Sequence, residues 1–205
     1  MKRTLFTITF LIVLKVIIAQ SCSYPKGGYA NYSELLDKTP SISFDFSIKK
    51  RTTSNITMSG GADYKITSQG VSKNVIKKEI FAISTGDTLF LNCYQHYLQT
   101  WYAKVISEGE FLVFFGPVSN GKAARLSSER NSMGAVNGAI VGGTVAALRD
   151  LYILDTSFRL AKPMNRGRLR NLLEDYPELL RQYNMEPDKN DKDVMLDYLI
   201  QINEQ

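Results

Sequence analysis

Residues 111–115, Phe-Leu-Val-Phe-Phe, are the stretch that most constrains how this chain can fold. They follow a turn at Glu108-Gly109 and are apolar at every position rather than at alternate positions. A strand of this kind is buried on both faces, and on an exposed sheet edge it would favour aggregation. The segments after it that could form a covering layer have helical patterns. We therefore expect helices to pack over this strand.

Other segments have the patterns of further strands. Residues 41–50 alternate strictly between apolar and polar side chains, as a half-buried strand does. Three turn signals predict hairpins. Their strands are residues 52–58 with 63–67 across Gly60-Gly61, residues 79–83 with 88–93, and residues 101–106 with 110–115. With a short strand at 151–154, these segments predict an antiparallel sheet, either open or closed like a barrel.

Helical patterns close the chain between residues 165 and 205. The apolar faces of the first and last of three helices are formed by Leu169, Leu172, Leu173 and Tyr176, and by Val194, Met195, Tyr198, Leu199 and Ile202. Pro177 suits the first turn of the helix between them. Strands followed by helices predict an α+β fold, with one domain over residues 20–205 and a C-terminal helical layer.

Residues 131–149 form a Gly/Ala-rich insertion with helical periodicity. Small residues recur there at intervals of four, among them Gly134, Gly138, Gly142 and, in a second column, Gly143. Four glycines inside a helix cost about 3 to 4 kcal/mol relative to alanine, which close backbone packing can offset. Three interpretations remain open: packing on the domain's own sheet, self-association into a homo-oligomer through a glycine zipper, and membrane association.

Residues 1–19 have the layout of a secretory signal peptide. Lys2 and Arg3 precede an apolar run, and Ala19 ends it, although Lys15 is unusual in such a leader. An uncleaved N-terminal anchor is the alternative. Without these residues the chain retains 22 basic and 20 acidic side chains of the original 25 and 20. This near-neutral balance gives no support for nucleic acid as a partner.

The two cysteines, Cys22 and Cys93, allow three states. An exported chain can join them in a disulfide. Small residues before Cys22, near the end of the leader, are also typical of a lipidated cysteine, although the usual upstream leucine is missing. Free thiols are the third state.

No coherent catalytic or metal-binding set is present in the sequence. His96 is the only histidine, and with Cys93 it supplies two potential zinc ligands without a second pair. A nucleophile–base pair of these two residues is the less favoured alternative. No phosphate-binding loop or dinucleotide fingerprint occurs. We therefore expect no cofactor, no metal and no assigned catalytic residue.

Aromatic residues are the remaining candidates for a ligand site. Two groups could form a platform for a sugar or a peptide, with ordinary strand packing as the favoured alternative. They are Tyr24, Tyr29 and Tyr32 near the mature start, and Tyr94, Tyr97, Trp101 and Tyr102 around the middle hairpin.

Several segments together resemble a family of exported proteins of unknown function from Bacteroidetes-type bacteria. They include residues 28–34, 38–40, 61–65, 78–92, 101–104, 152–155, 176–180 and 198–203, with the Gly-rich middle. The resemblance covers nearly all of the mature chain. It implies a Gram-negative envelope setting, periplasmic or at the outer membrane, and a leader that ends at Ala19-Gln20. It implies nothing about mechanism.

These observations favour a non-enzymatic binding or scaffolding module of the cell envelope. Its partner would be an envelope protein or a glycan. The alternatives are a membrane-associated or self-associating protein that uses the glycine-rich segment, and an envelope hydrolase without a recognisable motif.

Overall fold

The computed structural model describes residues 22–59, 61–131, 147–155 and 157–205. Seven strands form one antiparallel sheet in the order β1-β4-β5-β6-β7-β8-β9. Their bounds are β1 Gly27–Tyr29, β4 Ala82–Ser84, β5 Leu89–Asn92, β6 Tyr102–Ser107, β7 Phe111–Pro117, β8 Arg149–Asp155 and β9 Lys162–Pro163. The α+β prediction is confirmed. The barrel alternative is wrong, because the strands form an open sheet with β1 and β9 at its edges.

Strand β7 is buried on both faces, as its sequence predicts. Phe111 and Val113 belong to one core cluster together with the C-terminal helices. Leu112 and Phe114 belong to a second core cluster, which lies among the sheet and the N-terminal segments. Alternate side chains of β7 thus belong to two different cores, so this strand joins them. Burying each side chain of this size contributes about 1.5 to 3 kcal/mol.

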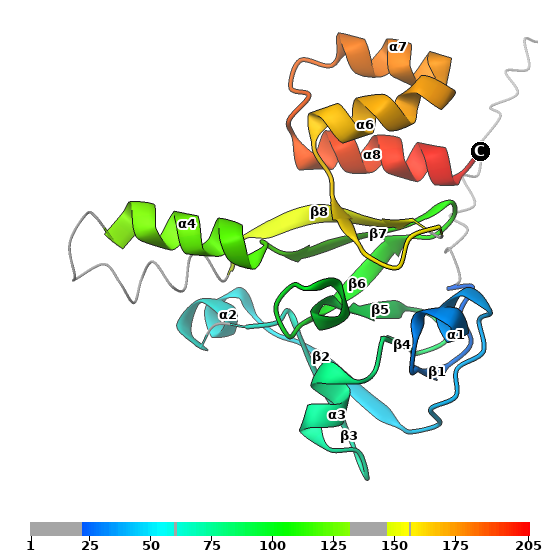
Figure 1. The fold of residues 1–205 in the computed structure, drawn as a ribbon, viewed down its shortest axis with the longest axis vertical. Helices are drawn as coiled ribbons and strands as arrows, with labels where there is room; N and C mark the ends of the chain where they lie inside the picture. Colours follow the sequence, from blue (N-terminus) through cyan, green and yellow to red (C-terminus); the bar gives the residue numbers. More distant parts are fainter. Residues whose placement is uncertain (1–21, 60, 132–146, 156) are drawn as a thin grey trace, which may run out of the picture.

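The C-terminal helices form the predicted layer over β7 and β8 (Figure 1). They are α6 Arg166–Leu172, the short 3-10 helix η3 Leu173–Asp175, α7 Pro177–Met185 and α8 Lys192–Asn203. Caps explain where they begin. Asn165 and Asp191 accept hydrogen bonds from backbone N–H groups of the first turns of α6 and α8, and Pro177 opens α7.

The N-terminal half contains a correction to the predicted hairpins. Residues 53–59 form helix α2 (Thr53–Ser59), not a strand. The hairpin partner of β3 (Tyr64–Ser68) is β2 (Phe46–Lys50), with Ile48 opposite Ile66. Of residues 41–45, only Ile42 forms a bridge, to Gly28. The hydroxyl of Thr52 accepts a hydrogen bond from the backbone N–H of Asn55 at 3.2 Å and so caps α2. The sequence pattern of residues 52–58 had predicted a strand here. The remaining helices of this half are α1 Tyr32–Leu36 and α3 Lys73–Lys78.

Helix α4 (Asn120–Asn131) follows β7 and extends away from the sheet (Figure 1). Lys122 on α4 and Lys192 on α8 both donate to the carboxylate of Asp150, at 2.8 and 3.0 Å. The leader at residues 1–19 lies outside the described residues. So do residues 132–146 of the Gly/Ala-rich insertion, which include Gly134, Gly138, Gly142 and Gly143. In the described part, no helix is both long and apolar enough to cross a membrane.

Candidate functional site

Several surface hollows among the described residues are large enough for a ligand, and one of them is built around the 3-10 helix η1 (Cys93–His96). Asn92 is fully buried and fixes this helix on the sheet. Its side-chain oxygen accepts from the N–H of Tyr94 at 3.2 Å, and its amide donates to the carbonyl of Ile80 at 2.7 Å. These hydrogen bonds fix the backbone of η1, from which the side chains of Tyr94 and Tyr97 reach the surface.

Tyr97 ends η1 in a conformation that is unusual for tyrosine. Its φ angle is +59°, in the left-handed region, and its side chain is 79% exposed. Left-handed backbone costs an L-residue other than glycine about 1 to 2 kcal/mol. Tyr94, on the same turn, is 42% exposed. Two tyrosine rings thus face water from one rigid turn.

A second segment, residues 157–161 between β8 and β9, lies beside η1. The N–H of Ala161 donates to Nδ1 of His96 at 3.3 Å, which joins the two segments. Phe158 is half-exposed, and Nζ of Lys162 lies 3.8 Å from the centre of its ring. Together the two segments enclose a hollow of about 620 Å³, which we call the aromatic groove. It is lined by Tyr94, Gln95, Tyr97, Leu98, Asn120, Arg159 and Leu160.

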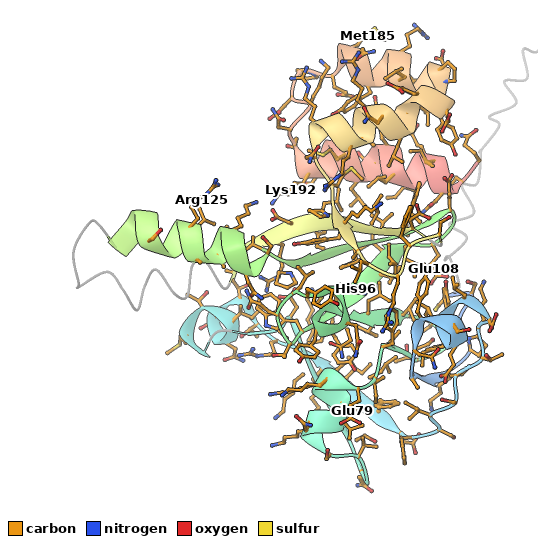
Figure 2. All side chains as sticks on the ribbon, viewed as in Figure 1. Glu79, His96, Glu108, Arg125, Met185 and Lys192 are labelled. Carbon is orange, nitrogen blue, oxygen red and sulfur yellow. The ribbon has the colours of Figure 1, made fainter. Side chains whose placement is uncertain are left out.

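His96, the last residue of η1 (Figure 2), is buried. Its ring packs edge-on against Phe81, with ring centres 5.3 Å apart, and lies 6.4 Å from Phe114. Burial lowers the pKa of His96 to about 4. Nε2 has no hydrogen-bond partner among the residues that the structure describes. The imidazole is therefore neutral near pH 7 and acts as an acceptor for Ala161.

Cys93 is fully buried, and burial raises the pKa of its thiol to about 12. A nucleophilic cysteine needs an accessible thiolate and a basic partner. Neither condition holds for Cys93 and His96, so the structure does not support this pair as a catalytic site. Within residues 22–59, 61–131, 147–155 and 157–205, no three His, Cys, Asp or Glu side chains lie close enough to hold a metal ion.

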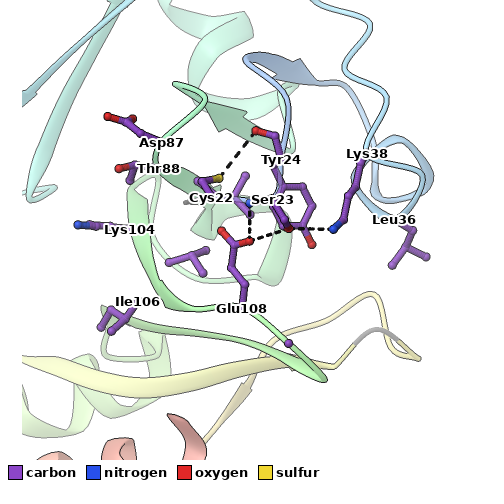
Figure 3. A pocket seen from close by; sticks show the side chains of 13 residues that line it. Cys22, Ser23, Tyr24, Leu36, Lys38, Asp87, Thr88, Lys104, Ile106 and Glu108 are labelled. Atoms are coloured by element: carbon purple, nitrogen blue, oxygen red, sulfur yellow. Dashed lines mark hydrogen bonds between the residues drawn. The ribbon is translucent and has the colours of Figure 1, made fainter. Parts of the chain in front are cut away.

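A second hollow lies where the described chain begins, and we call it the N-terminal groove (Figure 3). It measures about 540 Å³ and is bordered by Cys22, Lys38, Lys104, Ile106 and Glu108, among others. Oε2 of Glu108 accepts from the N–H and the hydroxyl of Ser23, at 3.0 and 2.8 Å. Nζ of Lys38 donates to the same hydroxyl at 2.8 Å. Because Glu108 and Lys38 are both engaged by Ser23, these contacts anchor the start of the described chain.

Cys22 and Cys93 are both free thiols in the structure; of the three states that the sequence leaves open, it does not show the disulfide. Sγ of Cys22 lies 3.7 Å from the hydroxyl of Ser84, which pairs with Leu89 at the start of β5. Cys93 follows the last residue of β5, on the order of 13 Å further along the strand. The two Cα atoms of a disulfide lie within about 7 Å. Lipidation of Cys22 stays a prediction.

The structure divides the predicted aromatic platforms. Tyr94 and Tyr97 form the exposed groove, whereas Trp101 and Tyr102 are buried, Trp101 under the guanidinium of Arg149 at 4.3 Å. The N-terminal platform does not form, because Tyr24 and Tyr29 are buried and Tyr32 packs against the same core. Sequence reasoning missed Phe158, Arg159 and Leu160. The available signal was a pair of large apolar residues, Phe158 and Leu160, on either side of an arginine.

Comparison with known proteins identifies a family without an established activity. The model of a family described as "Family of unknown function (DUF6563)" matches residues 27–205. No curated protein and no solved structure matches the chain. The resemblance to a family of unknown function is thereby confirmed, while the bacterial source and the export signal stay predictions.

Proposed function

The chain belongs to this DUF6563 family of unknown function, and we propose that it is an exported, non-enzymatic binding module of the cell envelope whose aromatic groove holds a glycan. The leader-like residues 1–19 support the export part of the proposal. The neutral, buried states of Cys93 and His96 support binding rather than catalysis at this place.

The exposed ring of Tyr97 on strained backbone carries the proposal. Strained backbone persists only where the surrounding structure enforces it, and such residues cluster at binding and catalytic sites. Here the strain presents an aromatic face to solvent. Burying that face against a ligand ring would recover hydrophobic free energy that the unbound protein leaves unused.

The size and chemistry of the groove favour a glycan over an envelope protein. Its volume of about 620 Å³ falls in the range of small-ligand pockets. Stable protein interfaces involve about 20 to 30 residues on each side, far more than line this groove. The tyrosine rings can pack against the apolar faces of sugar rings, and the amides of Gln95 and Asn120 match sugar hydroxyls.

A glycan array probed with the full chain, purified from cells that export it, tests this function. We expect binding to a restricted set of oligosaccharides, and Tyr97→Ala should weaken it at least tenfold in titration calorimetry. Phe44→Ala removes a half-exposed ring that lines a different hollow and serves as the matched control. Absence of any glycan binding, or equal binding by Tyr97→Ala and the control, would overturn the proposal.

A further inference from the structure

The charged side chains at the aromatic groove are positive. Arg159 is the one charged residue among those that line it, and its side chain is exposed. Within the described part of the chain, the guanidinium of Arg159 makes no hydrogen bond or ion pair. The neighbouring Lys162 adds a second positive charge beside Phe158. Among the described residues that line the groove, none carries a carboxylate that would compensate these charges.

The polar side chains near Arg159 bond to other partners, so the guanidinium is available to a ligand. Nε2 of Gln95 donates to the carbonyl of Lys78, which fixes this side chain and keeps its oxygen as an acceptor. The hydrogen bond between Ala161 and His96 fixes the segment that carries Arg159 against the turn that carries Tyr97. A cation and an aromatic face are therefore held together on two segments that are joined below the surface.

We propose that the ligand of this groove is an acidic saccharide, a sugar whose ring lies against Tyr97 and whose carboxylate pairs with Arg159. This inference rests on the proposed glycan-binding function and specifies its ligand class. A planar guanidinium binds a carboxylate through two parallel hydrogen bonds, which gives both charge selectivity and orientation. The amide groups of Gln95 and Asn120 meet the hydroxyls of the same or the next sugar.

The test compares acidic oligosaccharides with their own methyl esters, which keep the carbon skeleton and remove the charge. Suitable probes are trigalacturonic acid, an oligomer containing glucuronic acid, and sialyllactose. We expect the full chain to bind at least one acid more than tenfold more tightly than its ester, with a preference that weakens as salt is raised. Arg159→Gln should abolish the difference between acid and ester while the ester still binds.

Arg170→Gln is the matched control, since it removes the same charge from an exposed position on α6. A preference for acids that survives in Arg159→Gln, or is lost equally in the control, overturns the assignment of the carboxylate to Arg159. Binding of neutral glycans without any preference for acids overturns the ligand class and leaves the glycan-binding function standing. Binding of no glycan removes both proposals.

Discussion

Tyr97 combines a strained backbone with an exposed ring. The strain lowers the stability of the free protein, whereas the exposed ring is available to bind a ligand. The ring is 79% exposed, so truncating it removes little buried surface from the free protein. The left-handed φ of +59° is a conformation that asparagine adopts more readily than tyrosine. Residues retained for binding often reduce stability in this way.

We therefore predict that Tyr97→Asn raises the free energy of unfolding by about 0.5 to 1 kcal/mol while it removes glycan binding. Urea unfolding followed by circular dichroism measures the first effect, and calorimetric titration the second. Tyr94→Asn is the control for the stability measurement, because Tyr94 lies within η1 and has no positive φ angle to relieve. A loss of stability in Tyr97→Asn would show that the ring supports the fold.

His96 makes stability depend on pH. Its pKa is lowered by burial from 6.5 to about 4, so between these values the unfolded chain binds the proton more readily than the folded chain. Stability from this residue is complete above about pH 6.5 and is lost as the pH falls toward 4. The full loss amounts to about 3 kcal/mol.

Urea unfolding at pH 7.5, 5.5 and 4.5 checks this prediction in the wild type and in His96→Leu. The variant is expected to be less stable at pH 7.5, because the N–H of Ala161 loses its acceptor. Its stability should nevertheless fall less steeply than that of the wild type as the pH drops to 4.5. Parallel pH profiles would mean that the imidazole is already solvated in the folded state.

At the scale of elements, the end of α8 is fitted against the turn between β6 and β7. Asn203 accepts from the N–H of Phe111 at 3.0 Å and donates to its carbonyl at 2.9 Å and to Ser107 at 2.8 Å. A Cβ atom on Gly109 would lie 2.7 Å from Cβ of Asn203 and 2.8 Å from its backbone oxygen. Backbone at this distance cannot give way as a flexible side chain can.

Gly109→Ala is therefore expected to lower the free energy of unfolding by about 1 to 3 kcal/mol, through displacement of the end of α8. Gly121→Ala is the matched control on α4, where an added Cβ meets nothing within 4 Å. There the better helix propensity of alanine should raise stability by up to about 1 kcal/mol. Equal effects of the two substitutions, measured by urea unfolding, would contradict the tight fit at Gly109.

Elements were predictable from the sequence where burial imposes a period on the side chains. The apolar run of β7 predicts a strand that is covered on both faces, and the apolar faces of α6 to α8 predict the helical layer that covers one of them. Helix α2 was missed, because a short polar segment rich in threonine carries no such period and its helical form depends on local capping. Tyr94 and Tyr97 were predicted as part of a ligand platform. The pairing of that turn with Arg159, more than 60 residues later, exists only in the folded sheet.

At the scale of the whole molecule, the reactivity of the two thiols indicates whether Cys22 is free, acylated or joined to Cys93 in the mature protein. Cys22 is half-buried near the start of the described chain, and Cys93 lies in the core. Burial raises the pKa of both thiols, to about 12 for Cys93. Cys22 should therefore react slowly with a thiol reagent in the native protein, and Cys93 only after unfolding.

We predict that protein recovered from its native host has lost residues 1–19 and titrates one thiol when native and two when denatured. Intact mass spectrometry and a thiol reagent with and without urea make these measurements. Acyl chains on a protein that begins at Cys22 would identify it as a lipoprotein. A mass lower by two hydrogens, restored by reduction, would show a disulfide, and a retained leader would contradict export.

Pairing of β7 with β8 has a consequence for how this fold can diversify. The ladder ends at Pro117 opposite Arg149, so the 31 residues between them leave and re-enter the sheet at neighbouring positions. Neighbouring strands lie about 5 Å apart, so the two ends of this segment stay close together whatever its length. Insertions, deletions or exchange of this segment need not alter the register of any strand. A change of this segment can therefore leave the seven-stranded sheet in register while it alters the aromatic groove through Asn120.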